Sequence, residues 1–242
     1  ATEAAVRRQD NDAADAHVAA ITTIAARLPK VEHRAVALTG YVANETRRSA
    51  SARQILEDHL AAHPDLGDDP DLARVAVYLA RARMLDGDGD GGALLAHEVL
   101  GTVERLGMVD ETADALVTMG TCLVPHRTHQ GMALLKGALD LARKHGLTAT
   151  TTRALINIGY GSPDPAEQLE ATRQAFEDSR RVGDKSHGLF AMGNLVEGYV
   201  LNLELAAAIE LLYDPLTNNP TAADAVALDG SRAYLALLEG DR

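Results

Sequence analysis

The sequence predicts an all-α protein built from stacked antiparallel helical hairpins. Three observations favour this fold class. Apolar residues recur at three- and four-residue spacing, as Val18, Ile21, Ala25 and Leu28 do, and this spacing is typical of an amphipathic helix. The alternation of apolar and polar residues that would predict strands is nearly absent. The third observation is an internal repeat, which indicates that the helices are grouped into similar units.

Proline, glycine and acidic residues predict where these helices begin and end. The first expected helix ends at Pro29, and another ends at Pro64. The glycine-rich run 86–92 predicts a turn. We expect one repeat domain over 1–242, in which 1–48 form a helical hairpin that fits the pattern less well and 49–242 form the repeats. The further helices are expected over about 31–44, 49–63, 71–85, 93–106, 110–124, 128–145, 148–160, 165–182, 185–201, 204–213 and 222–238.

The repeat is clearest in the second half of the chain. Gly146 recurs 37 residues later as Gly183, and Asn157 recurs 37 residues later as Asn194. Gly107, 39 residues before Gly146, marks a fainter copy. Each glycine follows a predicted helix, where a left-handed residue is needed to end it. Because one hairpin cannot bury its apolar face alone, the units must stack on one another.

Composition narrows the functional classes. The chain has 242 residues, of which 46% are hydrophobic but only 3% aromatic, so the core must consist of closely packed small and aliphatic side chains. The net charge of −12 disfavours nucleic-acid binding and is compatible with a basic partner. The single cysteine, Cys122, cannot form an internal disulfide and is expected to be a small buried residue. No signal peptide or apolar span predicts membrane contact, so we expect a cytoplasmic location.

The repeat units resemble degenerate tetratricopeptide (TPR) repeats. Gly120, Tyr199 and the run 206–208 match the small and aromatic positions of that family, whereas its usual Trp is missing. The segments 135–147 and 153–159 are similar in style to the helical-repeat region of large bacterial signal-transduction ATPases and LuxR-type ATP-binding transcriptional regulators. The resemblance covers roughly residues 50–240. It implies a right-handed superhelix (α-solenoid) of about five to six antiparallel TPR-like helix hairpins.

The resemblance also implies a function. In such regulators the repeats form a non-catalytic sensor arm that binds a protein, peptide or small effector in its concave groove. Residues 233–242 look like the first helix of a further hairpin, so we expect a fragment of a longer protein with ATPase or DNA-binding modules elsewhere. A free-standing TPR scaffold or peptide-binding protein is the alternative. An all-helical enzyme is a remote one, because we find no catalytic residues, cofactor motif or phosphate loop in this segment.

The candidate ligand groove is predicted from the first helices of two successive hairpins. In TPR folds these helices face the concave side, and positions i, i+4 and i+7 share one helix face. Together the side chains would offer hydrogen-bond donors, acceptors and aromatic edges. The alternative is that the repeated asparagines only tie neighbouring repeats together. The predicted groove residues are Arg153, Asn157 and Tyr160, and one repeat later His187, Phe190, Asn194 and Glu197.

One metal-like pattern occurs in the glycine-rich turn. Asp86, Asp88 and Asp90 have the spacing that begins a calcium-binding loop. The twelfth position of such a loop needs a glutamate, but His97 stands there and Glu98 comes one residue late. We therefore interpret the run as a turn and predict no metal there.

Two histidine pairs and one acidic run also resemble metal-binding patterns. His59 and His63 share a helix face at i, i+4, which is compatible with a metal, and His126 lies close to His129 in a loop. We interpret both pairs as surface or capping histidines and expect no metal at either. The acidic run 68–71 precedes a helix, so we interpret it as a capping segment that complements the helix dipole.

Overall fold

The computed structural model describes residues 1–214, 229–230, 232–233 and 236, and every regular element in that part of the chain is helical. The chain divides into two compact units, residues 1–154 and 155–242, which we call unit 1 and unit 2. The expected helix over 222–238 and the segment 233–242 lie mostly outside the described residues.

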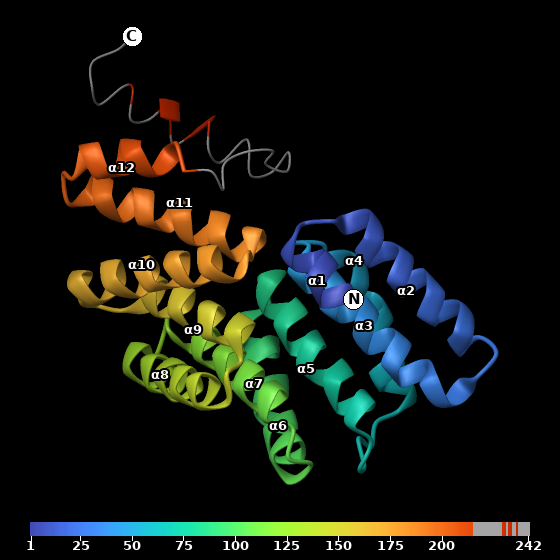
Figure 1. Cartoon of the computed structure of the whole chain (residues 1–242). Coiled ribbons are helices and arrows are strands. Elements are labelled where there is room, and N and C mark those ends of the chain that lie inside the picture. Colours follow the sequence, from blue (N-terminus) through green and yellow to red (C-terminus); the bar gives the residue numbers. More distant parts are fainter. Residues whose placement is uncertain (215–228, 231, 234–235, 237–242) are drawn as a thin grey trace. The chain divides into compact units, whose positions relative to one another are not determined.

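Unit 1 contains three helical hairpins preceded by two further helices (Figure 1). In each hairpin the two helices pack against each other, α3 with α4, α5 with α6 and α7 with α8. The first helices of the hairpins are neighbours, since α5 contacts both α3 and α7. The elements are α1 (Thr2–Arg7), α2 (Asn11–Ala25), the 3-10 turn η1 (Pro29–Val31), α3 (Glu32–Glu45), α4 (Ser49–Ala62), α5 (Pro70–Leu85), α6 (Gly89–Arg105), α7 (Val109–Leu123) and α8 (Thr128–His145).

Unit 2 continues the same antiparallel pattern. Helix α9 (Thr148–Gly161) contains the boundary between the units. It is followed by α10 (Pro165–Val182), α11 (Lys185–Leu201) and α12 (Leu205–Leu212). Helix α11 packs against both α10 and α12. The hairpin pattern predicted from the periodicity is therefore confirmed within each unit.

The predicted helix ends are confirmed where side chains or glycines determine them. The Asp69 carboxylate accepts hydrogen bonds from the backbone N–H groups of Asp71 and Leu72, at 2.9 and 3.1 Å, and caps α5. This confirms the capping interpretation of the acidic run. Gly107, Gly146 and Gly183 have φ angles of 69°, 68° and 71°. They adopt the left-handed conformation that a side chain would disfavour.

Only the first part of the glycine-rich run 86–92 forms a turn. Helix α6 begins at Gly89, four residues before the expected start, because Asp88 caps it by accepting a hydrogen bond from Gly91 N at 3.0 Å. Gly92 lies inside the helix, and a Cβ there would stand 2.9 Å from the carbonyl oxygen of Ala80. The glycine therefore allows α6 to approach α5 closely. Helix α1 is a further element that the periodicity did not predict.

Small side chains form much of the core, as the composition predicted. Helices α7 and α8 meet at two glycines, and a Cβ on Gly131 would lie 2.7 Å from the carbonyl oxygen of Gly120. Two larger hydrophobic clusters fill the spaces between the hairpins of unit 1. Their buried residues differ, but some partly buried side chains pack against both clusters. One contains Ala73, Ala76, Val77, Ala80, Ala96, Val99, Val103, Met108 and Ala115, and the other Ala37, Ala43, Ala52, Leu56, Val75, Leu79 and Ala82.

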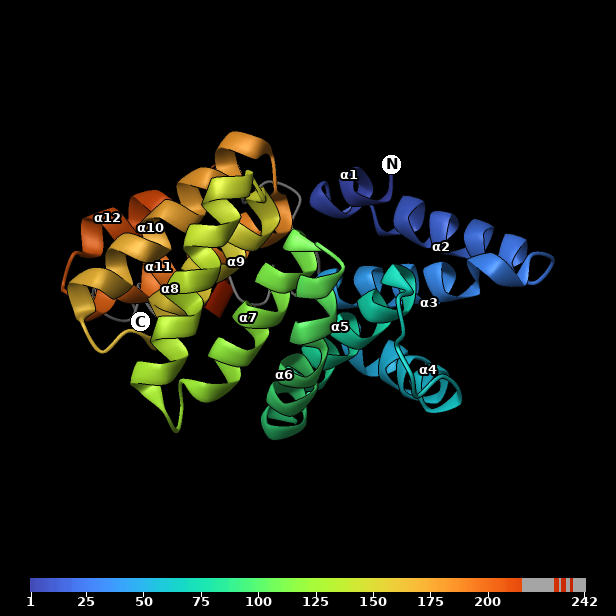
Figure 2. The ribbon, with the colours of Figure 1, turned by 90° about the horizontal axis from the view of Figure 1, so that it is seen from below.

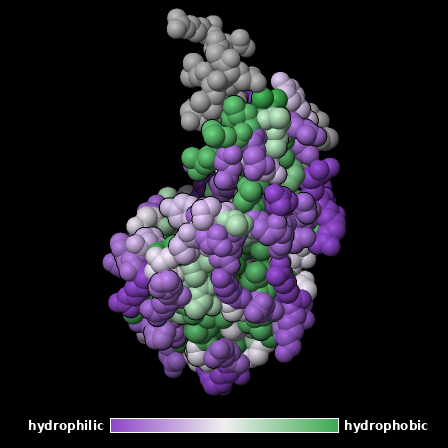
Figure 3. Space-filling model, turned by 90° about the vertical axis from the view of Figure 1, so that its left-hand side faces the viewer, coloured by the Kyte–Doolittle hydropathy of each residue, from purple (hydrophilic) through white to green (hydrophobic). Residues whose placement is uncertain are grey.

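Hydrophilic side chains occupy much of the surface in Figure 3, with smaller apolar areas between them. In the described part of the chain, no helix has the length and apolar character needed to cross a bilayer. Cys122 is half-buried rather than fully buried. Burial raises the pKa of its thiol to about 11, so the reactive thiolate is scarce at neutral pH.

Candidate functional site

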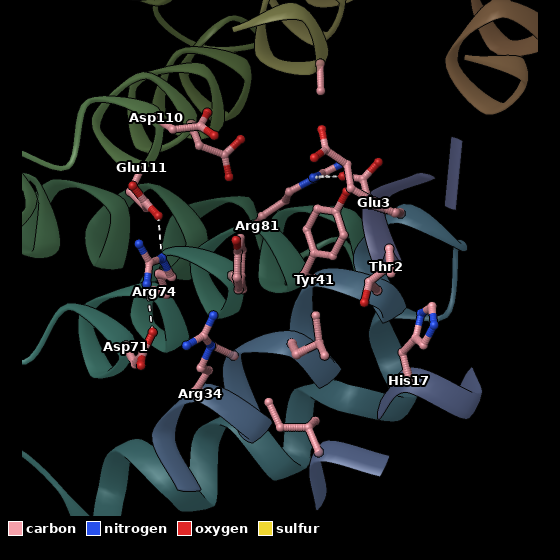
Figure 4. A pocket seen from close by; sticks show the side chains of 18 of the residues that line it. Thr2, Glu3, His17, Arg34, Tyr41, Asp71, Arg74, Arg81, Asp110 and Glu111 are labelled. Carbon is pink, nitrogen blue, oxygen red and sulfur yellow. Dashed lines mark hydrogen bonds and ion pairs between the residues drawn. The ribbon is translucent and has the colours of Figure 1, made fainter. Parts of the chain in front are cut away.

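A cavity of about 860 Å³ opens in unit 1 along the first helices of its hairpins. Figure 4 shows it from close by, and Figure 2 shows α1, α2, α3, α5 and α7, which supply most of its walls, from below. Helix α9 adds residues 149, 150 and 153 to the lining. The polar and aromatic lining residues are Thr2, Glu3, His17, Arg34, Tyr41, Glu45, Asp71, Tyr78, Arg74, Arg81, Asp110, Glu111, Asp114, Thr150 and Arg153.

One side of the lining is apolar. Helix α2 contributes Ala20, Ile21 and Ile24, and α3 contributes Ala37 and Leu38. The apolar side chains of α2 that line the cavity follow the helical spacing seen in the sequence. Ile24 is 50% exposed, so part of this wall remains available to a ligand. Apolar surface of this kind binds ligands by being removed from water.

The lining also carries a row of ion pairs across four successive first helices. Arg81 on α5 pairs with Glu45 on α3, and both side chains are almost completely buried. Arg153 on α9 pairs with Asp114 on α7, again with both side chains nearly buried. Each of these buried charges is paired with an opposite one, and the pairing offsets the free-energy cost of removing the charges from water.

Arg74 makes two further ion pairs in a more exposed part of the cavity. In Figure 4 Arg74 lies between two carboxylates, with Nε 2.5 Å from Glu111 Oε1 and Nη1 2.7 Å from Asp71 Oδ1. Arg74 is thus held in place by α7 and by its own helix α5. Such a clamped guanidinium can present a defined shape and polarity to a ligand.

Two tyrosines, one aspartate and one arginine that line this cavity have shifted pKa values. Burial raises the pKa of Tyr41 and of Tyr78, whose ring centroids lie 5.9 Å apart, so both phenols stay neutral. Burial also raises the pKa of Asp110, although Thr150 Oγ1 donates a hydrogen bond to it at 3.0 Å. Burial, followed by the charge of Arg81, lowers the pKa of Arg153 to about 9.

Arg153 is the one predicted groove residue that lines this cavity. The other six lie in unit 2. Asn157, His187 and Asn194 are half-buried, whereas Tyr160, Phe190 and Glu197 are exposed. His187 also has a local role, because its backbone N–H and its Nδ1 lie 3.1 and 2.9 Å from the carboxylate of Asp184, which caps α11.

The charged row was not predicted from the sequence, although the sequence carries a pattern that could have revealed it. Glu45, Arg81, Asp114 and Arg153 follow one another at spacings of 36, 33 and 39 residues. These spacings are close to the repeat length, and the sign of the charge alternates from one first helix to the next. A search for charge alternation at the repeat period would have found it.

The calcium-like turn has a different role. Arg53 on α4 places its two terminal nitrogens 2.9 Å from Asp86 Oδ2 and 3.1 Å from Asp88 Oδ2. Two of the three carboxylates of the calcium-like pattern thus bind an arginine, and Asp88 also caps α6, so both have structural roles.

Comparison with known proteins shows the fold. No family model matches the sequence, and no curated protein matches it. Among solved structures, the chain is similar to a Podosopora anserina protein assigned as a kinesin light chain, which has nearly identical TPR-like repeats. The two sequences are 14% identical, and the structures give a TM-score of 0.51. The match covers 83% of this chain and 95% of that one. A variant of the same repeats gives 16% identity, a TM-score of 0.50, and coverage of 85% and 95%. The chain therefore has the TPR-like α-solenoid fold predicted from the sequence.

Proposed function

We propose that unit 1 is a non-catalytic binding module that takes an extended segment of a partner protein into its cavity. The observation that carries this proposal is a lining that combines apolar side chains from α2 and α3 with a row of buried ion pairs. The buried arginines are already paired with carboxylates, which suits recognition rather than proton transfer. A cavity of about 860 Å³ is within the size range of ligand sites in proteins.

The charges favour a segment that carries a basic residue next to apolar ones. Six carboxylates and four arginines line the cavity among the described residues, so the lining is acidic overall. The carboxylate of Asp110 accepts a hydrogen bond from Thr150, and burial raises its pKa more than Arg153 and this hydrogen bond lower it. An incoming lysine or arginine would compensate the buried charge of Asp110, while neighbouring apolar side chains would pack against Ile21 and Leu38.

The test is selection of peptides from a random displayed library by the purified chain. We expect enrichment of peptides with lysine or arginine beside apolar residues. Binding of a selected peptide, followed by fluorescence anisotropy, should weaken at least tenfold in Asp110→Lys and remain unchanged in Asp140→Lys. Asp140 is an exposed residue on α8 and gives a matched charge reversal outside the cavity. Enrichment of acidic peptides, or equal effects of both variants, would refute the proposed specificity.

The predicted groove in unit 2 remains a second proposed surface. Asn157, Tyr160, His187, Phe190, Asn194 and Glu197 would contact the partner there, and the exposed rings of Tyr160 and Phe190 are its best anchors. The double variant Tyr160→Ala and Phe190→Ala should weaken capture of a partner that uses this surface. If the selected peptides bind the double variant with unchanged affinity, the cavity of unit 1 is sufficient for them.

We further propose that this binding module is the sensor arm of a larger cytoplasmic signalling or transcription regulator. The support is the similarity of segments 135–147 and 153–159 to the repeat regions of such regulators. The complete reading frame tests it. A phosphate-loop ATPase or a DNA-binding module in the same frame would support the sensor role, whereas a frame with neither would favour a free-standing scaffold.

A further inference from the structure

Three histidines from two helices meet at one end of the hairpin formed by α3 and α4. His59 lies near the end of α4 and His63 is its C-terminal cap residue, while His33 is the second residue of α3. One ring nitrogen from each imidazole lies within 4.8 Å of the other two. The sequence interpretation of surface or capping histidines holds for His63, which caps α4, but His59 is only 9% exposed and is not a surface residue. The sequence showed the pair on α4 but could not show that α3 supplies a third imidazole.

The hydrogen bonds indicate which nitrogen of each ring faces the centre of the cluster. His33 Nδ1 lies 2.7 Å from His59 Nε2, so these two atoms face each other. His63 Nδ1 lies 2.9 Å from the carbonyl oxygen of His59, which leaves His63 Nε2 as its available nitrogen. The three inward nitrogens are therefore His33 Nδ1, His59 Nε2 and His63 Nε2.

The three outward nitrogens each face an acceptor. His33 Nε2 lies 3.8 Å from Asp69 Oδ2, and His59 Nδ1 lies 3.9 Å from Glu32 Oε1. The outward nitrogen of His63 faces the carbonyl oxygen of His59, as described above. Metal-binding histidines typically donate their second ring N–H to a carboxylate or a backbone carbonyl, which orients the ring and increases its basicity. Here the outward nitrogen of His63 already has such a partner at hydrogen-bonding distance, whereas the carboxylates behind His33 and His59 would have to move closer to accept these hydrogen bonds.

We propose that His33, His59 and His63 bind a divalent transition-metal ion of the zinc class. Three imidazoles with an open fourth position form a known type of tetrahedral zinc site. Zinc–nitrogen bonds of about 2.1 Å place tetrahedral ligand atoms roughly 3.4 Å apart. The inward nitrogens need to move by no more than about 1.5 Å each to reach that spacing, which small rotations of the rings can supply.

The electrostatics of the cluster agree with this proposal. Burial, together with His33 and His63, lowers the pKa of His59. The neutral imidazole is the form that binds a metal, so the proton competes weakly at this position. Glu32 and Asp69 add negative charge around the cluster, which partly neutralises a divalent cation.

The ion would tie the beginning of α3 to the end of α4. This end of the hairpin also includes Asp69, the residue that caps α5. Metal binding would therefore stabilise the junction of three helices that help to line the cavity or support its walls. The side chains of His33 and Asp69 are 24% and 46% exposed, so water or a partner's side chain can reach the fourth position.

The experiment uses the whole chain without an affinity tag, stripped of metal by a chelator. Zinc chloride is titrated calorimetrically, and cobalt chloride is titrated in the visible range, where tetrahedral cobalt absorbs far more strongly than octahedral cobalt. We expect one ion per chain and a tetrahedral spectrum. Zinc should also raise the melting temperature of the chain. His33→Gln and His63→Gln should each weaken binding at least tenfold, and His129→Gln, at an exposed position on α8, should leave it unchanged.

Circular dichroism of each variant without metal separates loss of binding from loss of folding. The side chain of His33 is 24% exposed and that of His59 only 7%, so His33→Gln disturbs the packing less than a substitution of His59 would, and the decision rests on it. A folded His33→Gln variant that binds zinc as tightly as the unmodified chain would overturn the proposal. So would the absence of stoichiometric binding, an octahedral cobalt spectrum, or an equal loss of affinity in His129→Gln.

Discussion

Two regions of unit 1 gather ionisable groups in opposite ways. In the cavity, Arg81 and Arg153 each meet a carboxylate on a neighbouring first helix, so the buried charges neutralise each other. At the junction of α3 and α4, three imidazoles meet one another, and the carboxylates stand behind them rather than between them. The ion pairs of the first region are complete without a ligand, whereas in the second region one ring nitrogen from each of three imidazoles lies close to one point.

This difference shows how one repeat fold can support two kinds of site. The ion pairs of the row hold the first helices together. A ligand is then recognised by the shape of the cavity and by its remaining negative charge, which suits a peptide. A convergent set of lone pairs gains most from a small cation that all three can bind at once. Variants that remove one charge from the row, or that alter the helix spacing behind it, should sharpen this contrast.

The largest effect is expected when the buried row is broken. Asp114→Ala removes the carboxylate that pairs with the nearly buried guanidinium of Arg153, and removal of one partner of a buried ion pair costs about 3–5 kcal/mol. Urea unfolding followed by circular dichroism measures the loss. Asp178→Ala is the matched control, because it breaks the pair with Arg181, whose side chain is 73% exposed, and such surface pairs contribute about 0–1 kcal/mol. Similar losses in the two variants would show that the row is not a buried network.

The row and the histidine cluster also show what the sequence could and could not predict. Helices such as α8 and α10 were predicted within a residue or two, because their periodicity and their terminal Gly146 and Gly183 depend only on nearby residues. Arg153 was predicted to face a groove for the same local reason. Its partner Asp114 lies 39 residues earlier, so their contact depends on how neighbouring hairpins stack.

The histidine cluster follows the same rule. The i, i+4 spacing of His59 and His63 is a local property, but His33 joins them only because α3 and α4 are antiparallel and end at the same place. The early start of α6 also depends only on nearby residues, although it was not predicted. A run rich in glycine predicts a turn, yet Asp88 caps the helix and Gly92 fits beneath the carbonyl oxygen of Ala80.

A moderate effect is expected where α8 supports the helix that carries Asp114. Gly131→Ala places a methyl group against the carbonyl oxygen of Gly120, so α7 and α8 must separate, at a cost of about 1–3 kcal/mol. Gly137→Ala is the matched control on the same helix, because nothing lies within 4 Å of its added Cβ. That variant should gain about 0.5–1 kcal/mol from the better helix propensity of alanine. Opposite signs in thermal unfolding confirm the close approach, and a loss in both variants would contradict it.

The smallest effect is expected at Asp110, where a single carboxylate is buried against the charged row. Its raised pKa means that the folded chain holds this proton more tightly than the unfolded chain does. Asp110 therefore supports stability below its ordinary pKa of 3.8, and that contribution is lost as the pH rises through the higher folded value. Asp110→Asn does not titrate, and its side-chain oxygen can still accept the hydrogen bond from Thr150.

The melting temperature of Asp110→Asn should consequently match that of the unmodified chain near pH 4 and exceed it at pH 7. Asp140→Asn, at an exposed position, controls for the change in net charge and should show no such dependence. A variant that is less stable at pH 7 would mean that Arg153 compensates the charge of Asp110 more strongly than burial penalises it. The cavity would then be neutralised throughout, like the rest of the row, and the preference for a basic partner residue at Asp110 would lose its physical basis.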